Sequence, residues 1–154
     1  MRLERDVLSL SGVNTLIWLE GINDFSKNGM AAPEKVIAQL SEGVKRLNSA
    51  GIRVIGATVG SALGSTSAAH GFPAQDEKRK ALNTFIRSSD IFAGVIDFDA
   101  VTLDPTTGQM RPEFVPDSTV GGAGDKLHPN RVGYHAMGNA IDLDLVAGMR
   151  QVKP

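Results

Sequence analysis

The chain contains no cysteine. This absence excludes disulfide bonds, thiolate metal sites and a cysteine nucleophile, and it leaves the redox compartment undecided. Apolar runs long enough to span a bilayer are also lacking, and the first residues lead into no signal-type apolar core. The sequence therefore predicts no membrane span and leaves the localisation open.

An excess of charge of one sign is lacking too, because 16 basic residues face 17 acidic ones and the net charge is -1. No cluster of Lys and Arg interleaved with aromatic residues is present, as nucleic-acid binding would require. We therefore expect no nucleic-acid partner. The length of 154 residues and a hydrophobic content of 42% suffice for a sizeable core, and they predict a single domain over residues 1–154.

Short apolar runs alternate with helix-like patterns through the first hundred residues. Residues 15–20 form a nearly continuous apolar run, which is typical of a strand buried on both faces. A helix is expected over residues 33–51, a second strand over 52–59, another helix over 76–89 and a third strand over 95–98. This alternation predicts a doubly wound α/β fold with a parallel sheet and right-handed crossovers.

Two long segments without helix or strand patterns are expected to form loops. Residues 60–73 are rich in Gly, Ser and Ala and include His70, which suggests a loop at the site or a disordered excursion. Residues 104–124 contain several Pro and Gly residues and lead directly to Asp125. A final helix is expected over 129–150, with an apolar residue at every fourth position. These apolar residues are Met137, Ile141, Leu145 and Met149.

Asp125 and His128 place a carboxylate and an imidazole three residues apart, immediately before the final helix. A carboxylate hydrogen-bonded to one ring nitrogen fixes the tautomer, and it stabilises the imidazolium that forms when the other nitrogen takes a proton. Such a pair acts as orienter and base in acyl-transfer sites. The alternative is structural, because Asp often caps a helix and His-Pro often ends a loop.

Two motifs that occur in order give the chain a resemblance to a known family. Gly21-Ile22-Asn23-Asp24 follows the first strand, and Asp125-Lys126-Leu127-His128-Pro129 precedes the last helix. With these motifs the chain resembles the SGNH (GDSL-type) esterase and lipase family. The resemblance implies a three-layer α/β/α, flavodoxin-like fold and a carboxylic ester hydrolase without a cofactor. It also implies that Asp125 and His128 are catalytic and that Asn23 and Gly21 belong to an oxyanion hole, although a close backbone turn at the strand end is the better explanation of Gly21.

The chain departs from the family at the start. The Gly-Asp-Ser triplet that carries the family's nucleophilic serine is absent, so the chain resembles the C-terminal part of such an enzyme, truncated at the N-terminus. We therefore expect weak or no esterase activity from this chain alone. The strand over 15–20 would lack its neighbour, and we expect self-association through that exposed edge or pairing with a separately supplied N-terminal piece. A non-catalytic binding or scaffolding protein is the alternative.

Other site assignments are weaker. Ser26, Ser61 and Ser65 could replace the nucleophile, but none lies in a strand-turn-helix elbow, and ordinary loop serines are the better interpretation. A metal site built from the three histidines, His70, His128 and His135, lacks suitable ligand spacing. Phe72 and Phe114 could line an acyl pocket or pack on the surface, and Asp97, Asp99 and Asp104 are expected to satisfy backbone turns.

Overall fold

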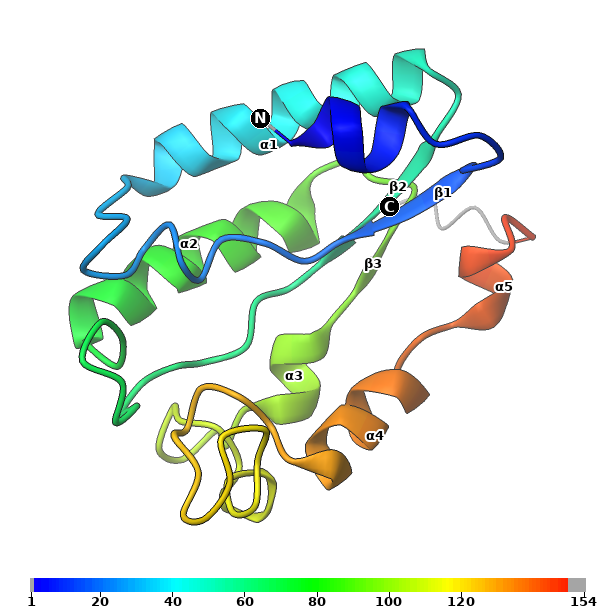
Figure 1. Cartoon of the computed structure of the whole chain (residues 1–154). Helices are drawn as coiled ribbons and strands as arrows, with labels where there is room; N and C mark the ends of the chain where they lie inside the picture. Colours follow the sequence, from blue (N-terminus) through cyan, green and yellow to red (C-terminus); the bar gives the residue numbers. More distant parts are fainter. Residues whose placement is uncertain (1, 150–154) are drawn as a thin grey trace.

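The computed structural model describes residues 2–149, which form three layers with a parallel sheet in the middle (Figure 1). Helices cover both faces of the sheet, as the predicted doubly wound α/β fold requires. The short turns η1 and α3 were not anticipated from the sequence. The elements in chain order are η1 (Glu4–Leu8), β1 (Thr15–Trp18), α1 (Pro33–Ser49), β2 (Arg53–Ala57), α2 (Pro73–Ser88), β3 (Gly94–Ile96), α3 (Phe98–Thr102), η2 (Pro112–Phe114), α4 (Arg131–Asn139) and α5 (Leu143–Val146).

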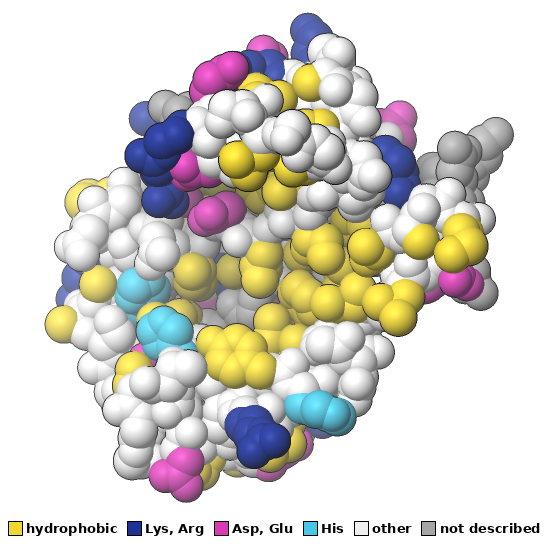
Figure 2. Space-filling model, turned by 45° about the vertical axis from the view of Figure 1, so that its right-hand side comes forward, with side chains coloured by type: hydrophobic (Ala, Val, Ile, Leu, Met, Phe, Trp, Pro, Cys, Tyr) yellow, Lys and Arg dark blue, Asp and Glu magenta, His cyan; other side chains and the backbone are white. Residues whose placement is uncertain are grey.

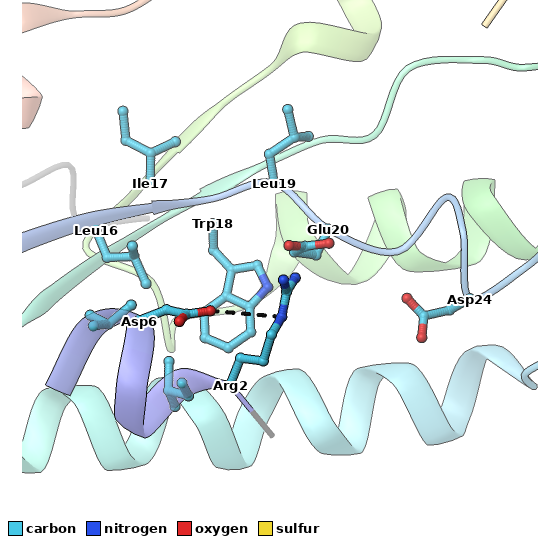
Figure 3. A pocket seen from close by; sticks show the side chains of 10 residues that line it. Arg2, Asp6, Leu16, Ile17, Trp18, Leu19, Glu20 and Asp24 are labelled. Carbon is cyan, nitrogen blue, oxygen red and sulfur yellow. Dashed lines mark ion pairs between the residues drawn. The ribbon is translucent and has the colours of Figure 1, made fainter. Parts of the chain in front are cut away.

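The three strands lie in the order β1-β2-β3, and both neighbouring pairs are parallel. In the first pair, Leu16 lies opposite Val54 and Trp18 lies opposite Gly56. Successive side chains of a strand point to opposite faces, so Leu16 and Trp18 pack on the α1 side while Ile17 packs on the α5 side. Figure 3 shows Trp18 pointing away from Ile17 and toward α1.

Helices α1 and α2 cover the first face of the sheet (Figure 1). Each begins with a proline, Pro33 or Pro73, at a position where the missing N–H breaks no helical hydrogen bond. Proline thus starts α2 three residues earlier than the sequence pattern predicted. Gly43 lets α1 approach β1 closely, because a Cβ atom there would lie 2.6 Å from Trp18 Cη2. Gly51 follows α1 with a φ of +77°, a conformation that glycine adopts without strain.

Helices α4 and α5 cover the opposite face of the sheet (Figure 1). The sequence predicted one continuous helix here, and this prediction was wrong, because the chain turns between Asn139 and Leu143. Asp142 accepts hydrogen bonds from the backbone N–H groups of Asp144 and Leu145 and so starts a new helix. Leu145 is buried in this layer as predicted, whereas Met149 is 76% exposed. The predicted end of the helix at residue 150 lies outside the described residues.

A buried ion network fixes the carboxyl ends of the strands. The Arg79 guanidinium, which is 1% exposed, pairs with Asp76 and Asp99 and donates a hydrogen bond to the Val59 carbonyl oxygen. Just beyond the same end of β2, the Asn83 side chain accepts a hydrogen bond from the Val59 N–H and donates one to the Val59 carbonyl oxygen. From the sequence we expected Asp99 to satisfy a backbone turn, which does not include its place in this ion network. Because the polar groups of this network have partners, they hold α2 and the segments after β2 and β3 in one arrangement.

Strand β1 lies at the edge of the sheet and pairs only with β2 among the described residues. A groove of 440 Å³ runs along β1 and is lined by Leu16, Trp18 and Leu19 together with Arg2 and Glu20 (Figure 3). The edge that the sequence predicted to be open is therefore open in the described part of the chain. No helix within residues 2–149 is long and apolar enough to cross a membrane.

Candidate active site

Asp125 and His128 form a hydrogen-bonded pair. Asp125 Oδ2 lies 2.7 Å from His128 Nδ1, and because an ionised carboxylate only accepts hydrogen bonds, the Nδ1–H group is the donor. The backbone N–H groups of Leu127 and His128 donate to the other carboxylate oxygen, at 3.0 and 2.9 Å. His128 Nε2 has no hydrogen-bond partner within residues 2–149, and 48% of the side chain is exposed. The ring nitrogen opposite Asp125 is thus available to accept a proton.

The local electrostatics keep Asp125 ionised. Burial acts to raise its pKa, but the backbone N–H of His128, the His128 ring and the Leu127 N–H together outweigh this effect, and the pKa lies below its usual value. An ionised carboxylate next to Nδ1 is what the orienting partner of an imidazole base requires.

The helix that follows His128 holds the pair in place. Asn130 caps α4 by accepting a hydrogen bond from the Gly133 N–H, while its amide group donates to the carbonyl oxygens of Glu113 and Pro116. The capping residue therefore joins the start of α4 to the long loop that precedes Asp125. Pro129, between His128 and this cap, is buried. These contacts restrict the backbone on the carboxyl side of the imidazole.

Asn23 and Gly21 lie in the turn that follows β1. The Asn23 carbonyl oxygen accepts hydrogen bonds from the backbone N–H and hydroxyl of Ser26, and its side chain is exposed. Gly21 is buried with a φ of +127°, and a Cβ atom there would lie 2.6 Å from Leu82 Cδ2. Close packing thus requires glycine at position 21, as its structural interpretation predicted. Whether either residue binds an oxyanion stays a prediction.

The Gly- and Ser-rich loop after β2 connects the two motif-bearing segments. The Thr66 N–H donates to the Asp125 carbonyl oxygen at 3.2 Å, and three residues later the Ala69 carbonyl oxygen accepts a hydrogen bond from the Lys27 N–H at 3.0 Å. Lys27 Nζ also lies 4.0 Å from the centre of the Phe72 ring. This loop therefore joins the turn after β1 to the segment of Asp125 and His128, which agrees with its interpretation as a loop at the site.

An apolar cavity of 180 Å³ lies at the carboxyl ends of the strands. Ile22, the neighbour of Asn23, lines it together with Leu127 and Pro129, which lie on either side of His128. The two sequence motifs therefore meet around one cavity, where the doubly wound fold places its ligands. Figure 2 shows apolar side chains gathered across the hollow of this face, with histidine side chains beside them. Neither Phe72 nor Phe114 lines the cavity.

The three serines considered as nucleophiles have structural contacts. The Ser26 hydroxyl donates to the Asn23 carbonyl oxygen, the Ser61 hydroxyl donates to that of Gly108, and the Ser65 hydroxyl accepts from the Ser67 N–H. No serine is hydrogen-bonded to His128 within residues 2–149. In the same part of the chain, no group of three or more His, Asp or Glu side chains is arranged to hold a metal ion.

The fold and this site define an α/β protein with a parallel sheet and an Asp–His pair at the carboxyl edge of its strands. A GDSL-like lipase from Bacteroides thetaiotaomicron is similar in structure, with a TM-score of 0.77 and 18% identity over 96% of this chain and 68% of the lipase. A protein from Bacteroides fragilis named as an acylhydrolase has a TM-score of 0.76 and 20% identity, over 97% of this chain and 68% of its own. A protein from Desulfitobacterium hafniense named as a lipolytic protein of the G-D-S-L family has a TM-score of 0.63 and 20% identity, over 90% of this chain and 69% of its own.

These three likenesses confirm the predicted SGNH-type fold. At 18 to 20% identity they establish the architecture and leave the activity to be argued from the site. The chain spans about two thirds of the length of each neighbour. No protein-family model matches the sequence, and no curated protein matches it.

Proposed function

We propose that this chain carries the acid–base part of a carboxylic ester hydrolase site. The observation that supports the proposal is the Asp125–His128 hydrogen bond of 2.7 Å, which leaves Nε2 free and lies beside an apolar cavity. In this proposal His128 Nε2 takes the proton of the attacking hydroxyl and then delivers it to the leaving alcohol. Asp125 stabilises the imidazolium between the two steps.

The remaining part of the site is an oxyanion hole and a pocket. In the proposal the Asn23 amide donates to the developing oxyanion, and the N–H of Gly21 lies on the same turn. The acyl group would occupy the cavity lined by Leu127 and Pro129. A cavity of 180 Å³ is smaller than the several hundred cubic ångströms of pockets for drug-sized ligands. We therefore propose short acyl esters, such as acetyl esters, as substrates.

The choice of nucleophile is expected to limit the activity of this chain. Because no serine is hydrogen-bonded to His128 within residues 2–149, hydrolysis by the chain alone is expected to require His128 to activate water. General-base action alone contributes about 10² to 10⁴ in rate, so this hydrolysis is expected to be slow. A serine from another segment, paired along the open edge of β1, would complete a Ser-His-Asp site.

Hydrolysis of p-nitrophenyl acetate by the wild-type chain and by His128→Ala tests the proposal. The wild-type rate is expected to exceed the buffer rate, and His128→Ala is expected to lower it to that level. His135→Ala is the matched control, because His135 lies exposed on α4 and would contribute only as a general surface imidazole. Equal turnover in the wild type and in His128→Ala would reject the proposal.

The second candidate is a non-catalytic binding or scaffolding protein, and the lack of a serine hydrogen-bonded to His128 in the described residues favours it. Labelling with a fluorophosphonate separates the two candidates in part. Ester turnover that depends on His128 without labelling would indicate the water mechanism. No turnover and no labelling would favour the binding protein.

A further inference from the structure

Met110 lies between two cavities. It lines the apolar cavity of 180 Å³ beside the Asp125–His128 pair, and it also lines a second cavity of 320 Å³. Within residues 2–149, no other residue lines both. The neighbours Lys126 and Leu127 show the same division, because Lys126 lines the second cavity and Leu127 lines the first. The two cavities are therefore adjacent and share Met110 as their common wall.

The backbone around Met110 is held by hydrogen bonds on both sides. The Asp104 N–H donates to the Gln109 carbonyl oxygen at 2.9 Å, and the Arg111 N–H donates to the Thr102 carbonyl oxygen at 2.9 Å. Met110 itself is 5% exposed. A methionine side chain is unbranched and has three rotatable bonds, so it fills irregular gaps between apolar walls. Shortening this side chain therefore opens the wall while the backbone hydrogen bonds of its loop remain.

The second cavity offers apolar surface on one part of its wall and paired polar groups on another. Pro112, Val115 and Pro116 supply the apolar surface. Lys126 Nζ donates a hydrogen bond to Gln109 Oε1 at 3.0 Å. Because these two polar groups are paired with each other, an apolar chain that lies along the proline residues does not have to break their hydrogen bond.

We propose that Met110 limits the length of the acyl group that the site accepts, because its side chain separates the cavity beside His128 from the larger one. This inference rests on the proposed ester hydrolase function, in which the smaller cavity takes the acyl group. It names the side chain that restricts the substrates to short acyl esters. With a smaller side chain at position 110, a longer acyl chain can extend into the cavity of 320 Å³. Met110 is then a specificity-determining residue.

Two unreactive ketones of different length test the proposal. The ketone 2-butanone has the shape of methyl acetate and 3-octanone has that of methyl hexanoate, with a methylene group in place of the ester oxygen. Each is titrated into the full chain with ¹³C-labelled methionine methyl groups, and NMR follows Met110 and Met137, which line the first cavity. Met30 and Met149 are internal controls, since both are 76% exposed and line neither cavity. In the wild type, 2-butanone is expected to shift Met110 and Met137 in a saturable manner, and 3-octanone is expected to bind no more tightly.

Shortening Met110 is expected to reverse this preference. Met110→Ala should bind 3-octanone at least about tenfold more tightly than 2-butanone, because each further methylene group that leaves water favours binding. Met110→Leu keeps a side chain of similar volume and is expected to keep the wild-type preference. Met137→Ala removes the same kind of side chain from the first cavity only, and the tenfold preference should be absent. If Met110→Ala does not fold, the milder Met110→Val should change the preference in the same direction.

Three results of the titrations would overturn the proposal. The first is the same preference in the wild type and in the shortened variants of Met110. The second is a wild-type chain that already binds 3-octanone more tightly by the margin expected of Met110→Ala. The third is that neither ketone shifts Met110 or Met137, because the cavity would then take no acyl group.

Hydrolysis of p-nitrophenyl acetate and p-nitrophenyl hexanoate separates this inference from the hydrolase proposal. If the ketones bind as expected but turnover never depends on His128, the hydrolase proposal fails while Met110 still limits what the cavity takes. If turnover depends on His128 and Met110→Ala leaves the ratio of the hexanoate rate to the acetate rate unchanged, the inference about Met110 fails and the hydrolase proposal stands.

Discussion

The Asp125 carboxylate accepts hydrogen bonds from the Leu127 N–H, the His128 N–H and the His128 ring. Asp125→Asn keeps an oxygen for the two backbone groups but presents an N–H donor to His128 Nδ1. That donor would favour the tautomer with the proton on Nε2, which cannot act as a base. We expect His128-dependent ester hydrolysis to fall about 10²- to 10⁴-fold, with little change in stability. Steady-state rates of this variant and of the exposed control Asp90→Asn check this, and equal rates for both would contradict it.

Asp97 makes the stability of the fold depend on pH. Hydrogen bonds from Arg87 chiefly, and from Thr58 and the Ala100 N–H, lower the pKa of Asp97 from 3.8 to about 2 against the effect of its burial. Because the folded pKa lies below the unfolded one, the ionised carboxylate stabilises the fold above pH 3.8, and this contribution is lost as the pH falls toward 2.

Asp97→Asn should therefore reduce the fall in unfolding free energy over this acid range. Asparagine can still accept the hydrogen bonds of Thr58 and Ala100, but it does not titrate. Urea denaturation at several pH values between about 5 and 2 measures the difference from the wild type. The same pH dependence in both proteins would show that this carboxyl is not coupled to folding.

At the scale of elements, Leu145 is the buried side chain through which α5 packs on the sheet, and Arg53 of β2 also donates hydrogen bonds to the carbonyl oxygens of Leu145 and Val146. Leu145 is 3% exposed and lies so close to β3 that a Cβ atom at Gly94 would be 2.5 Å from its Cδ1 atom. Leu145→Ala is expected to lower the free energy of unfolding by about 2 to 5 kcal/mol, because it leaves a cavity beneath the helix. Leu143→Ala, at a position 75% exposed on the same helix, should change it by less than about 0.5 kcal/mol. Similar urea midpoints for both variants would refute this attachment.

Much of the fold could be predicted at this scale, because strands and helices have different apolar periods. The strands β1, β2 and β3 and the helices α1 and α2 lie where the alternation placed them. The break between α4 and α5 could not be predicted from apolar spacing, because Leu145 continues the four-residue pattern across it. The helix restarts because the Asp142 side chain accepts hydrogen bonds from the Asp144 and Leu145 N–H groups. Whether these hydrogen bonds form depends on the backbone conformation of the turn, which the apolar spacing does not report.

The site was predictable only where its residues are close in sequence. The spacing of Asp125 and His128 indicated their hydrogen bond, since a turn of three residues brings such side chains together. Met110 and Arg79 could not be placed in the same way, because the residues around them lie far along the chain and their burial follows from the tertiary packing. For Met110, the sequence offered only a methionine within a long loop that contains several Pro and Gly residues.

Within residues 2–149, the molecule presents an unpaired edge of β1 beside a groove that is lined by both apolar and charged side chains. Unpaired N–H and C=O groups of an edge strand favour pairing with another chain, and a net charge of -1 opposes association only weakly. We therefore propose self-association along β1 and expect sedimentation velocity to detect species larger than the monomer at micromolar concentration. Leu19→Lys, at the end of β1 and 41% exposed, should shift the distribution toward the monomer. Met30→Lys, at a position 76% exposed and outside the groove, should not.

A wild-type chain that sediments as a monomer would contradict this proposal without affecting the Asp125–His128 site. If the edge instead pairs with a serine-bearing segment, the segment should compete with self-association. The oligomeric state and the ester chemistry are thus separate tests of the molecule.

The proposed acid–base role of His128 requires that Asp125 holds the ring with Nδ1 protonated and Nε2 free to take a proton. ¹⁵N NMR of the histidine-labelled chain, at a pH where the imidazole is neutral, measures this tautomer directly and needs neither substrate nor nucleophile. We expect a proton on Nδ1 and an unprotonated Nε2 for His128, with the pattern lost in Asp125→Ala. A proton on Nε2, or a spectrum of His128 that does not respond to Asp125→Ala, would contradict it.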